Sequence, residues 1–170
     1  MGHSIRGFVA RPETLQAIRA RFPAAKLVGL DAGFALVPGT DALIAEIDAA
    51  DPTDEGMARS IDFLFDHPAM LRLLADASAQ GPIAFVETDY FEGRGAQVAT
   101  ACVGGSVVTS KERQGEGQGE ARPINSALRA IGVARAPGED EFDTVCLGKF
   151  RSMAAFESAA AGATGSSTRG

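Results

Sequence analysis

The chain has 170 residues, of which 45% are apolar, and this suffices for one globular domain that needs no disulfide or metal for folding. Its apolar runs are shorter than the roughly 18 residues that cross a bilayer, and its first residues lack the apolar segment of a secretory signal. We therefore expect a cytoplasmic protein with no membrane partner. The net charge is −6, and residues 27–100 carry thirteen acids against three bases, which disfavours nucleic acid and favours a basic protein partner.

The N-terminal part of the chain predicts a strand, a helix and two short strands. Residues 4–11 alternate between two faces, as in a half-buried strand. Pro12 suits the first turn of the helix that follows, and Pro23 ends it. Two further short strands are expected at 26–30 and 34–38, around a tight turn.

Three helices are expected next. Thr40 is a candidate cap for the first and Thr53 for the second, while the third covers 69–80 and ends at Gly81. Apolar residues at helical spacing predict a buried stripe on the first two helices. These stripes comprise Leu43, Ile44 and Ile47, and then Met57, Ile61, Leu64 and Phe65.

The middle of the chain predicts three consecutive antiparallel strands. They are expected at Pro82–Tyr90, Ala96–Val103 and Ser106–Ser110, and the Gly104-Gly105 pair is typical of a tight hairpin turn. Strands and helices thus occur in blocks rather than in strict alternation. The fold class predicted is α+β, a single domain with a mixed, mainly antiparallel sheet and a β-meander (about 82–110) packed against several helices.

The remaining segments are expected to be a loop, a short helix, a last strand and a tail. Residues 112–122 are rich in Gly, Glu and Gln and predict a flexible loop, and Asn125 begins a helix that follows it. The segment 141–150 is interpreted as a strand. The domain is expected to cover residues 1–156, and the Ala/Gly/Ser/Thr-rich tail, residues 157–170, is expected to be disordered.

The two cysteines and two histidines do not form a metal-binding motif. Cys102 and Cys146 are not part of a CxxC pair, and His3 and His67 are too few to complete a zinc site. We expect both thiols to be reduced and buried in strands, and we expect no metal and no cofactor.

The stretch Val86–Gly105 holds the candidate site. With a five-residue turn at Phe91–Gly95, Asp89 would face Gln97 across the hairpin, and Glu87 would lie on the same face as Asp89. The two carboxylates would then be about 6–7 Å apart along one strand.

Three interpretations of this stretch stay open. The acids are solvated where the strand leaves the core, or they line a pocket as an acid/base or cation-binding pair, or the hairpin tip contacts another protein. The Gly-Arg-Gly turn is no phosphate loop, because neither Gly-Lys-Ser/Thr nor a helix follows it. The candidate binding residues are Glu87, Asp89, Tyr90, Arg94 and Gln97.

Three segments resemble a set of uncharacterised bacterial proteins. The shared pattern is Tyr-Phe-x-Gly-x-Gly-x-Gln in a hairpin, Ile-Asn-x-Ala-Leu-Arg-x-x-Gly-Val in a helix, and Asp-Glu-Phe-Asp in a strand. Here it begins at Tyr90, Ile124 and Asp140, so the resemblance covers the C-terminal half. It implies no activity. In size, acidity and architecture the chain is also similar to immunity-type proteins that neutralise bacterial toxins.

Two functions follow as hypotheses. The first is an acidic binding protein of immunity type that binds a basic protein, based on the eight acids between Asp41 and Asp66. The second is a small enzyme or ligand-binding domain that uses the hairpin carboxylates in a cleft. Whether the chain is an enzyme, and its oligomeric state, are open at this stage.

Overall fold

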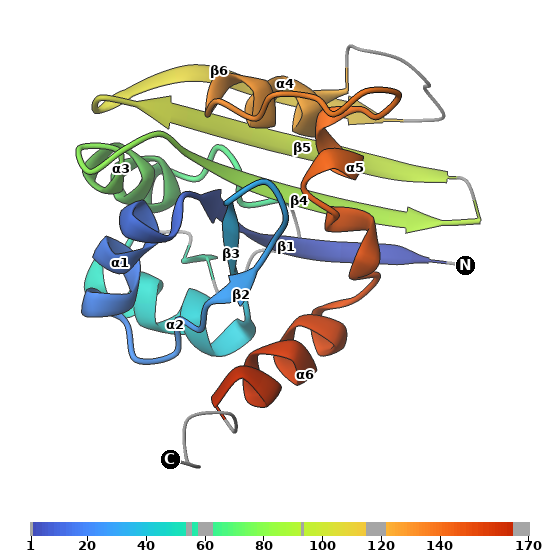
Figure 1. The fold of residues 1–170 in the computed structure, drawn as a ribbon. Helices are drawn as coiled ribbons and strands as arrows, with labels where there is room; N and C mark the ends of the chain where they lie inside the picture. The colour runs from blue at the N-terminus through green and yellow to red at the C-terminus, as the bar shows by residue number, and fades with distance from the viewer. Residues whose placement is uncertain (1, 54–55, 58–62, 93, 115–121, 165–170) are drawn as a thin grey trace, which may run out of the picture.

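The computed structural model describes residues 2–53, 56–57, 63–92, 94–114 and 122–164 (Figure 1). Its strands form one six-stranded antiparallel sheet in the order β2-β3-β1-β4-β5-β6. The strands are β1 His3–Ala10, β2 Val28–Gly29, β3 Ala35–Pro38, β4 Ile83–Phe91, β5 Arg94–Val103 and β6 Ser106–Gln114.

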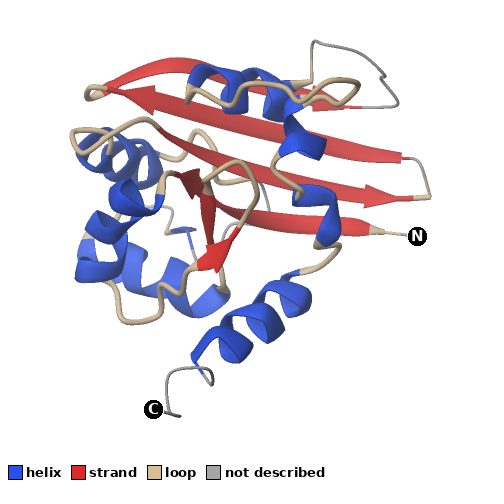
Figure 2. Ribbon diagram, in the orientation of Figure 1, coloured by secondary structure: helices blue, strands red, loops and turns tan. Residues whose placement is uncertain are grey.

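Helices cover both faces of this sheet, as Figure 2 shows. One face packs against α1, α2 and α3, and the other against α4, α5, the 3₁₀ helix and α6. Their bounds are α1 Pro12–Arg21, α2 Asp41–Ala50, α3 Pro68–Ala77, α4 Pro123–Ala130, α5 Glu141–Thr144, the 3₁₀ helix Leu147–Lys149 and α6 Met153–Thr164.

Strand β4 is buried on both faces, because each face of the sheet has its own apolar core. Phe85 points into the core under α1–α3, where its ring centroid lies 4.9 Å from that of Phe8. Ala84 and Val86 point into the opposite core, under α4–α6. The alternation of side chains along a strand thus explains why the run Ile83–Val86 is continuously apolar.

The predicted α+β class and the meander are confirmed by β4, β5 and β6, which are sequential antiparallel neighbours. Gly104 and Gly105 form the two-residue turn between Val103 and Ser106, with φ of 57° and 85°. Both angles lie in the region that glycine adopts without steric cost. The Thr40 cap is also confirmed, since its hydroxyl accepts a bond from the N–H of Leu43.

The helix predicted from Thr53 lies largely outside the described residues. Phe63, Leu64 and Phe65 are described, and they are not helical. The flexible loop predicted at 112–122 is wrong for residues 112–114, because β6 continues to Gln114. Residues 115–121 are outside the described residues.

The strand predicted at 141–150 is wrong. This segment forms α5 and the 3₁₀ helix instead. Asp140 caps α5, because its carboxylate accepts a 2.9 Å bond from the N–H of Asp143. This local cap outweighs the strand-like composition of the segment. Cys146 then takes a left-handed conformation with φ of 58°, which ends any extended run.

The tail is not disordered from residue 157 onward, because α6 continues to Thr164. Alanine has the highest helix propensity, and the segment is alanine-rich. Phe156 and Ala160, one helical turn apart, are both buried in the core that α6 covers. Residues 165–170 lie outside the described residues. Within the described ranges, no helix is long and apolar enough to span a membrane.

Candidate functional site

A pocket of about 290 Å³ lies beside the first half of β1. Strand β3 ends at Pro38, opposite Gly7, so residues 3–6 of β1 have no β3 partner. The segment that leads into α6 covers this edge, and Ser4 N–H donates to the carbonyl of Arg151 across 3.1 Å. The lining residues are Ser4, Ile5, Arg6, Phe63, Glu87, Thr88, Asp89 and Met153.

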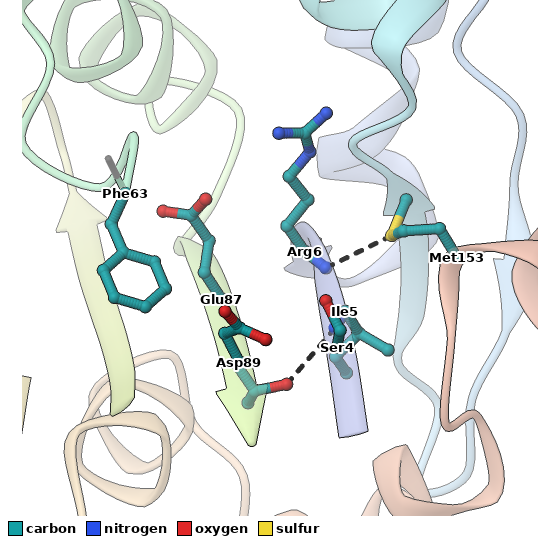
Figure 3. A pocket seen from close by; sticks show the side chains of 8 residues that line it. Ser4, Ile5, Arg6, Phe63, Glu87, Asp89 and Met153 are labelled. Carbon is teal, nitrogen blue, oxygen red and sulfur yellow. Dashed lines mark hydrogen bonds between the residues drawn. The ribbon is translucent and has the colours of Figure 1, made fainter. Parts of the chain in front are cut away.

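Figure 3 shows the side chains of Glu87 and Asp89 between Phe63 on one side and Arg6 on the other. Glu87 and Asp89 are alternate residues of β4 and therefore share a face of the sheet. Arg6 lies opposite Glu87 on β1, and Ser4 lies opposite Asp89. The pocket is thus built on facing positions of the neighbouring strands β1 and β4, and Phe63 borders it on the other side.

Glu87 is the most unusual residue of the pocket. Glu87 is only 4% exposed, and its Oε2 accepts a 2.7 Å hydrogen bond from the N–H of Leu64. Burial raises the pKa of Glu87 to about 7, although backbone N–H groups of Leu64 and Phe65 and the charge of Arg6 act in the opposite direction. Burial therefore favours the protonated form of this carboxyl.

The guanidinium group of Arg6 forms no ion pair with Glu87 and instead bonds to Gly39 and Asp41. Its Nε donates to the carbonyl oxygen of Gly39, and its Nη2 lies 2.6 Å from Oδ1 of Asp41. Met153 fixes the backbone of the same residue, since its sulfur accepts a bond from Arg6 N–H at 3.3 Å. The guanidinium therefore lines the pocket and pairs with Asp41, whose side chain is exposed to solvent.

The segment that carries Phe63 is attached to the sheet at two points. The first is the bond from Leu64 to Glu87 on β4. The second is on β5, where Thr100 Oγ1 donates to the carbonyl of Phe65 at 2.7 Å. The buried Thr100 hydroxyl also lies 3.0 Å from that of Ser110. These polar contacts fix the wall of the pocket over the sheet.

The predicted pairing of Asp89 with Gln97 is wrong. Phe91 pairs with Arg94, so the β4–β5 turn has two residues instead of five, and Asp89 faces Ala96. Glu92 makes this possible by taking a left-handed conformation with φ of 51°. A register change of one residue reverses the face of every side chain, so Gln97 points away from the acids.

Gln97 instead belongs to a polar cluster on the opposite face. Its amide nitrogen donates to the hydroxyl of Tyr90 at 3.1 Å, and its amide oxygen accepts from the N–H of Ile124 at 3.4 Å. Of the five predicted site residues, the structure therefore brings Glu87 and Asp89 together and places Tyr90 and Gln97 elsewhere. Arg94 is in the strand register opposite Phe91, at the hairpin tip.

No local signal in the sequence points to the other pocket residues. Arg6 and Ser4 alternate within an ordinary strand, whereas Phe63 and Met153 come from segments 90 residues apart along the chain. Only the tertiary structure places them around Glu87. The one usable signal was that Arg6 lies directly opposite Glu87. It can be recognised only when the register between β1 and β4 is known.

The segments that begin at Ile124 and Asp140 meet between α4 and α5. Asn125 donates to Asp140 at 2.9 Å and accepts from the N–H of Phe142 at 3.1 Å. Glu141 is 2% exposed, and its Oε1 lies 2.7 Å from Nε of Arg129. These contacts fasten α5 to α4, which is a structural role.

The thiols are free, and only one of them lies in a strand. Cys102 is buried in β5 as predicted, whereas Cys146 is half-buried in a turn and donates to Oδ2 of Asp31 at 3.1 Å. This contact and burial raise the pKa of the Cys146 thiol. Among the described residues, no group of three or more His, Cys, Asp or Glu side chains is arranged to hold a metal ion.

Comparisons of the chain with models of protein families, with curated proteins and with solved structures found no match.

Proposed function

We propose that this protein binds a small polar molecule in the pocket beside β1, with Glu87 as the group that recognises it. The proposal is carried by one observation: a carboxyl group that is almost fully buried lies on the wall of a 290 Å³ pocket. Among the described residues no Lys, Arg or His forms an ion pair with it. A pocket of this size is close to the lower limit for small-ligand sites.

Stability alone does not account for Glu87. Burial of a carboxyl without a cationic partner costs free energy, and the raised pKa of Glu87 shows that the bond from Leu64 N–H offsets this cost only in part. Perturbed acids in concave sites are typical of binding and catalysis. With a pKa of about 7, Glu87 is able to accept or release a proton near neutral pH.

The other hypothesis, an immunity-type protein with a basic partner, has weaker support. Several acids of the run 41–66 accept bonds within the chain, which leaves fewer of them for a partner. These bonds are Asp41 with Arg6, Asp51 with Arg72, Glu46 with Ala24 N–H, and Asp48 with Met57 N–H. The pocket is therefore the better-supported site.

The experiment is a ligand screen by NMR on the ¹⁵N-labelled full chain, with amines, amino acids, sugars and carboxylic acids as probes. We expect at least one class to shift the backbone signals of Leu64, Arg6 and Asp89 saturably. Glu87→Gln should abolish the shift, and Glu13→Gln should retain it, because Glu13 is an exposed residue of α1. The proposal fails if no probe class moves the three signals.

A further inference from the structure

We infer that the Glu87 pocket selects a small organic cation, one that carries an ammonium or guanidinium group. This inference rests on the proposed function and names its ligand class. The inference is based on the charged groups of the pocket wall, on the aromatic ring of Phe63, and on the small number of metal ligands that the wall offers.

Among the residues that line the pocket, two carry carboxyl groups and one carries a guanidinium group. Arg6 is the guanidinium of the wall, and two of its donors are directed to the carbonyl of Gly39 and to the carboxylate of Asp41. Glu87 and Asp89 project from the same face of β4, with Asp89 exposed at the mouth and Glu87 buried at the inner wall. An entering ligand therefore meets two carboxyl groups, separated by about 6–7 Å along the strand.

A cation would stabilise the ionised form of the buried Glu87 more than that of the exposed Asp89. A carboxylate removed from water is stabilised chiefly by a positive charge in direct contact, because the surrounding medium screens charge poorly. An ammonium or guanidinium group would donate to a carboxyl oxygen of Glu87 beside the bond from Leu64 N–H. A neutral donor would provide the bond without compensating the charge.

Phe63 gives the pocket a wall suited to an organic cation. It lies beside Glu87 and Asp89 in Figure 3 and is partly buried against the core under α1–α3. The face of an aromatic ring attracts cations, and its apolar surface accommodates the alkyl part of an amine. The volume of about 290 Å³ restricts the ligand to a small molecule.

A divalent metal ion fits these residues less well. Ca²⁺ takes 6–8 oxygen ligands, and Mg²⁺ requires an octahedral set. The described wall offers two carboxyl groups at alternate strand positions, and no cluster of three acidic, His or Cys ligands occurs in the described residues. An organic cation needs only the acceptors that are present.

Cation binding should be linked to release of the Glu87 proton. The charged groups that face this carboxyl are Arg6 on β1, Asp89 on β4 and Asp66 beyond the Phe63 segment, with Asp41 behind Arg6. Arg6 lowers the pKa of Glu87 and Asp66 raises it, while burial is the largest effect and brings it to about 7. A bound cation would favour the ionised form, so binding should be tighter at higher pH.

The test uses n-propylammonium and methylguanidinium as probes, with propionamide and propionate as neutral and anionic probes of similar size, and CaCl₂ and MgCl₂ as metal probes. Each is titrated into the ¹⁵N-labelled full chain at about pH 6 and about pH 8, and the Leu64 signal is followed. We expect both organic cations to bind saturably, and to bind about tenfold more tightly at the higher pH, because the ionised fraction of Glu87 rises about tenfold between them.

Two variants separate the roles of the carboxyl groups. Glu87→Gln should remove the pH dependence and weaken binding at least about tenfold at the higher pH, whereas Asp89→Asn should weaken binding only a few-fold and keep the pH dependence. Glu13→Gln on α1 makes the same change of charge away from the pocket and should change neither. If Glu87→Gln fails to fold, Asp89→Asn and the pH dependence of the unmodified chain still decide the result.

The inference is overturned if propionamide, propionate or a metal ion binds as tightly as the organic cations. It is also overturned if neither cation shifts the Leu64 signal at concentrations up to about 50 mM. In the first case a ligand still binds, so the proposed function remains while its ligand class is wrong. If the complete screen described above also leaves the pocket signals unmoved, both fail.

Discussion

The backbone N–H of Leu64 donates a 2.7 Å hydrogen bond to Oε2 of Glu87, 23 residues further along the chain. This bond places an irregular segment over the middle of the sheet and gives a buried carboxyl its main described partner. It also links the state of that carboxyl to the wall of the pocket, because Phe63 precedes Leu64 directly. The protonation of Glu87 should consequently affect both folding and binding.

We expect Glu87 to make the free energy of unfolding fall as pH rises from about 4.5 to about 7. Its ordinary pKa is 4.5 and its folded pKa is about 7, so within this range the folded state holds a proton that the unfolded state has lost. The contribution is fully present below about 4.5 and lost above about 7, and a shift of this size corresponds to about 3 kcal/mol.

Urea denaturation across this pH range, on the unmodified chain and on Glu87→Gln, measures the effect. The amide of Gln does not titrate, so the difference between the two profiles isolates Glu87 from the other carboxyl groups. Parallel profiles would show that Glu87 has an ordinary pKa in the folded state.

Replacement of Phe85 by Ala should destabilise the protein strongly, and replacement of Asp89 by Ala should not. Phe85 is fully buried against Phe8, and loss of such a ring costs about 3–5 kcal/mol. Asp89 is exposed at the mouth of the pocket, so its loss should change the free energy of unfolding by less than about 0.5 kcal/mol. Denaturant midpoints of both variants test this contrast, and equal losses would mean that Asp89 is a buried structural partner.

The short β4–β5 turn predicts that Gly95 tolerates no side chain. Gly95 has φ of 153°, and a Cβ there would overlap the carbonyl oxygen of Asp89. We expect Gly95→Ala to cost several kcal/mol, on the order of 3, because backbone must move to relieve the overlap. Gly104→Ala is the matched control: its φ of 57° is unfavourable for alanine, but no atom lies within 4 Å of the new Cβ.

The control variant Gly104→Ala should therefore lower the free energy of unfolding by only about 1–2 kcal/mol. Thermal unfolding of the two variants, measured side by side, gives the comparison. A Gly95→Ala protein as stable as Gly104→Ala would contradict the two-residue turn and, with it, the register that separates Asp89 from Gln97.

Glu141 should be needed for the attachment of α5 to α4. Its carboxylate lies 2.7 Å from Nε of Arg129 and 3.8 Å from Nε of Arg135, and the residue is 2% exposed. We expect Glu141→Gln to lower the free energy of unfolding by about 1–3 kcal/mol through loss of charge-assisted hydrogen bonding. Glu139→Gln, at an exposed position two residues earlier, should have little effect.

Chemical denaturation of these two variants measures the difference. If they lose equal amounts of stability, the contact between Glu141 and Arg129 adds nothing beyond general charge balance.

The sequence by itself determined the elements whose signals are local. Alternation defined β1, the Thr40 hydroxyl defined the start of α2, and the Gly104-Gly105 pair defined the turn between β5 and β6. Each signal arises from atoms a few residues apart, so it operates before any tertiary contact forms. It also correctly placed Glu87 and Asp89 on one face of a strand.

Tertiary structure decided which residues surround those acids. The β4–β5 register depended on a left-handed Glu92, a conformation that composition does not favour, and the resulting turn moved Gln97 to the opposite face. The helix at 141–144 is an exception, because its signal is local: Asp140 caps it despite a strand-like composition. Above all, Arg6 and Phe63 meet Glu87 only across the packed sheet. A pocket made by distant segments has no local signal, because the burial that gives Glu87 its pKa exists only once those segments have packed.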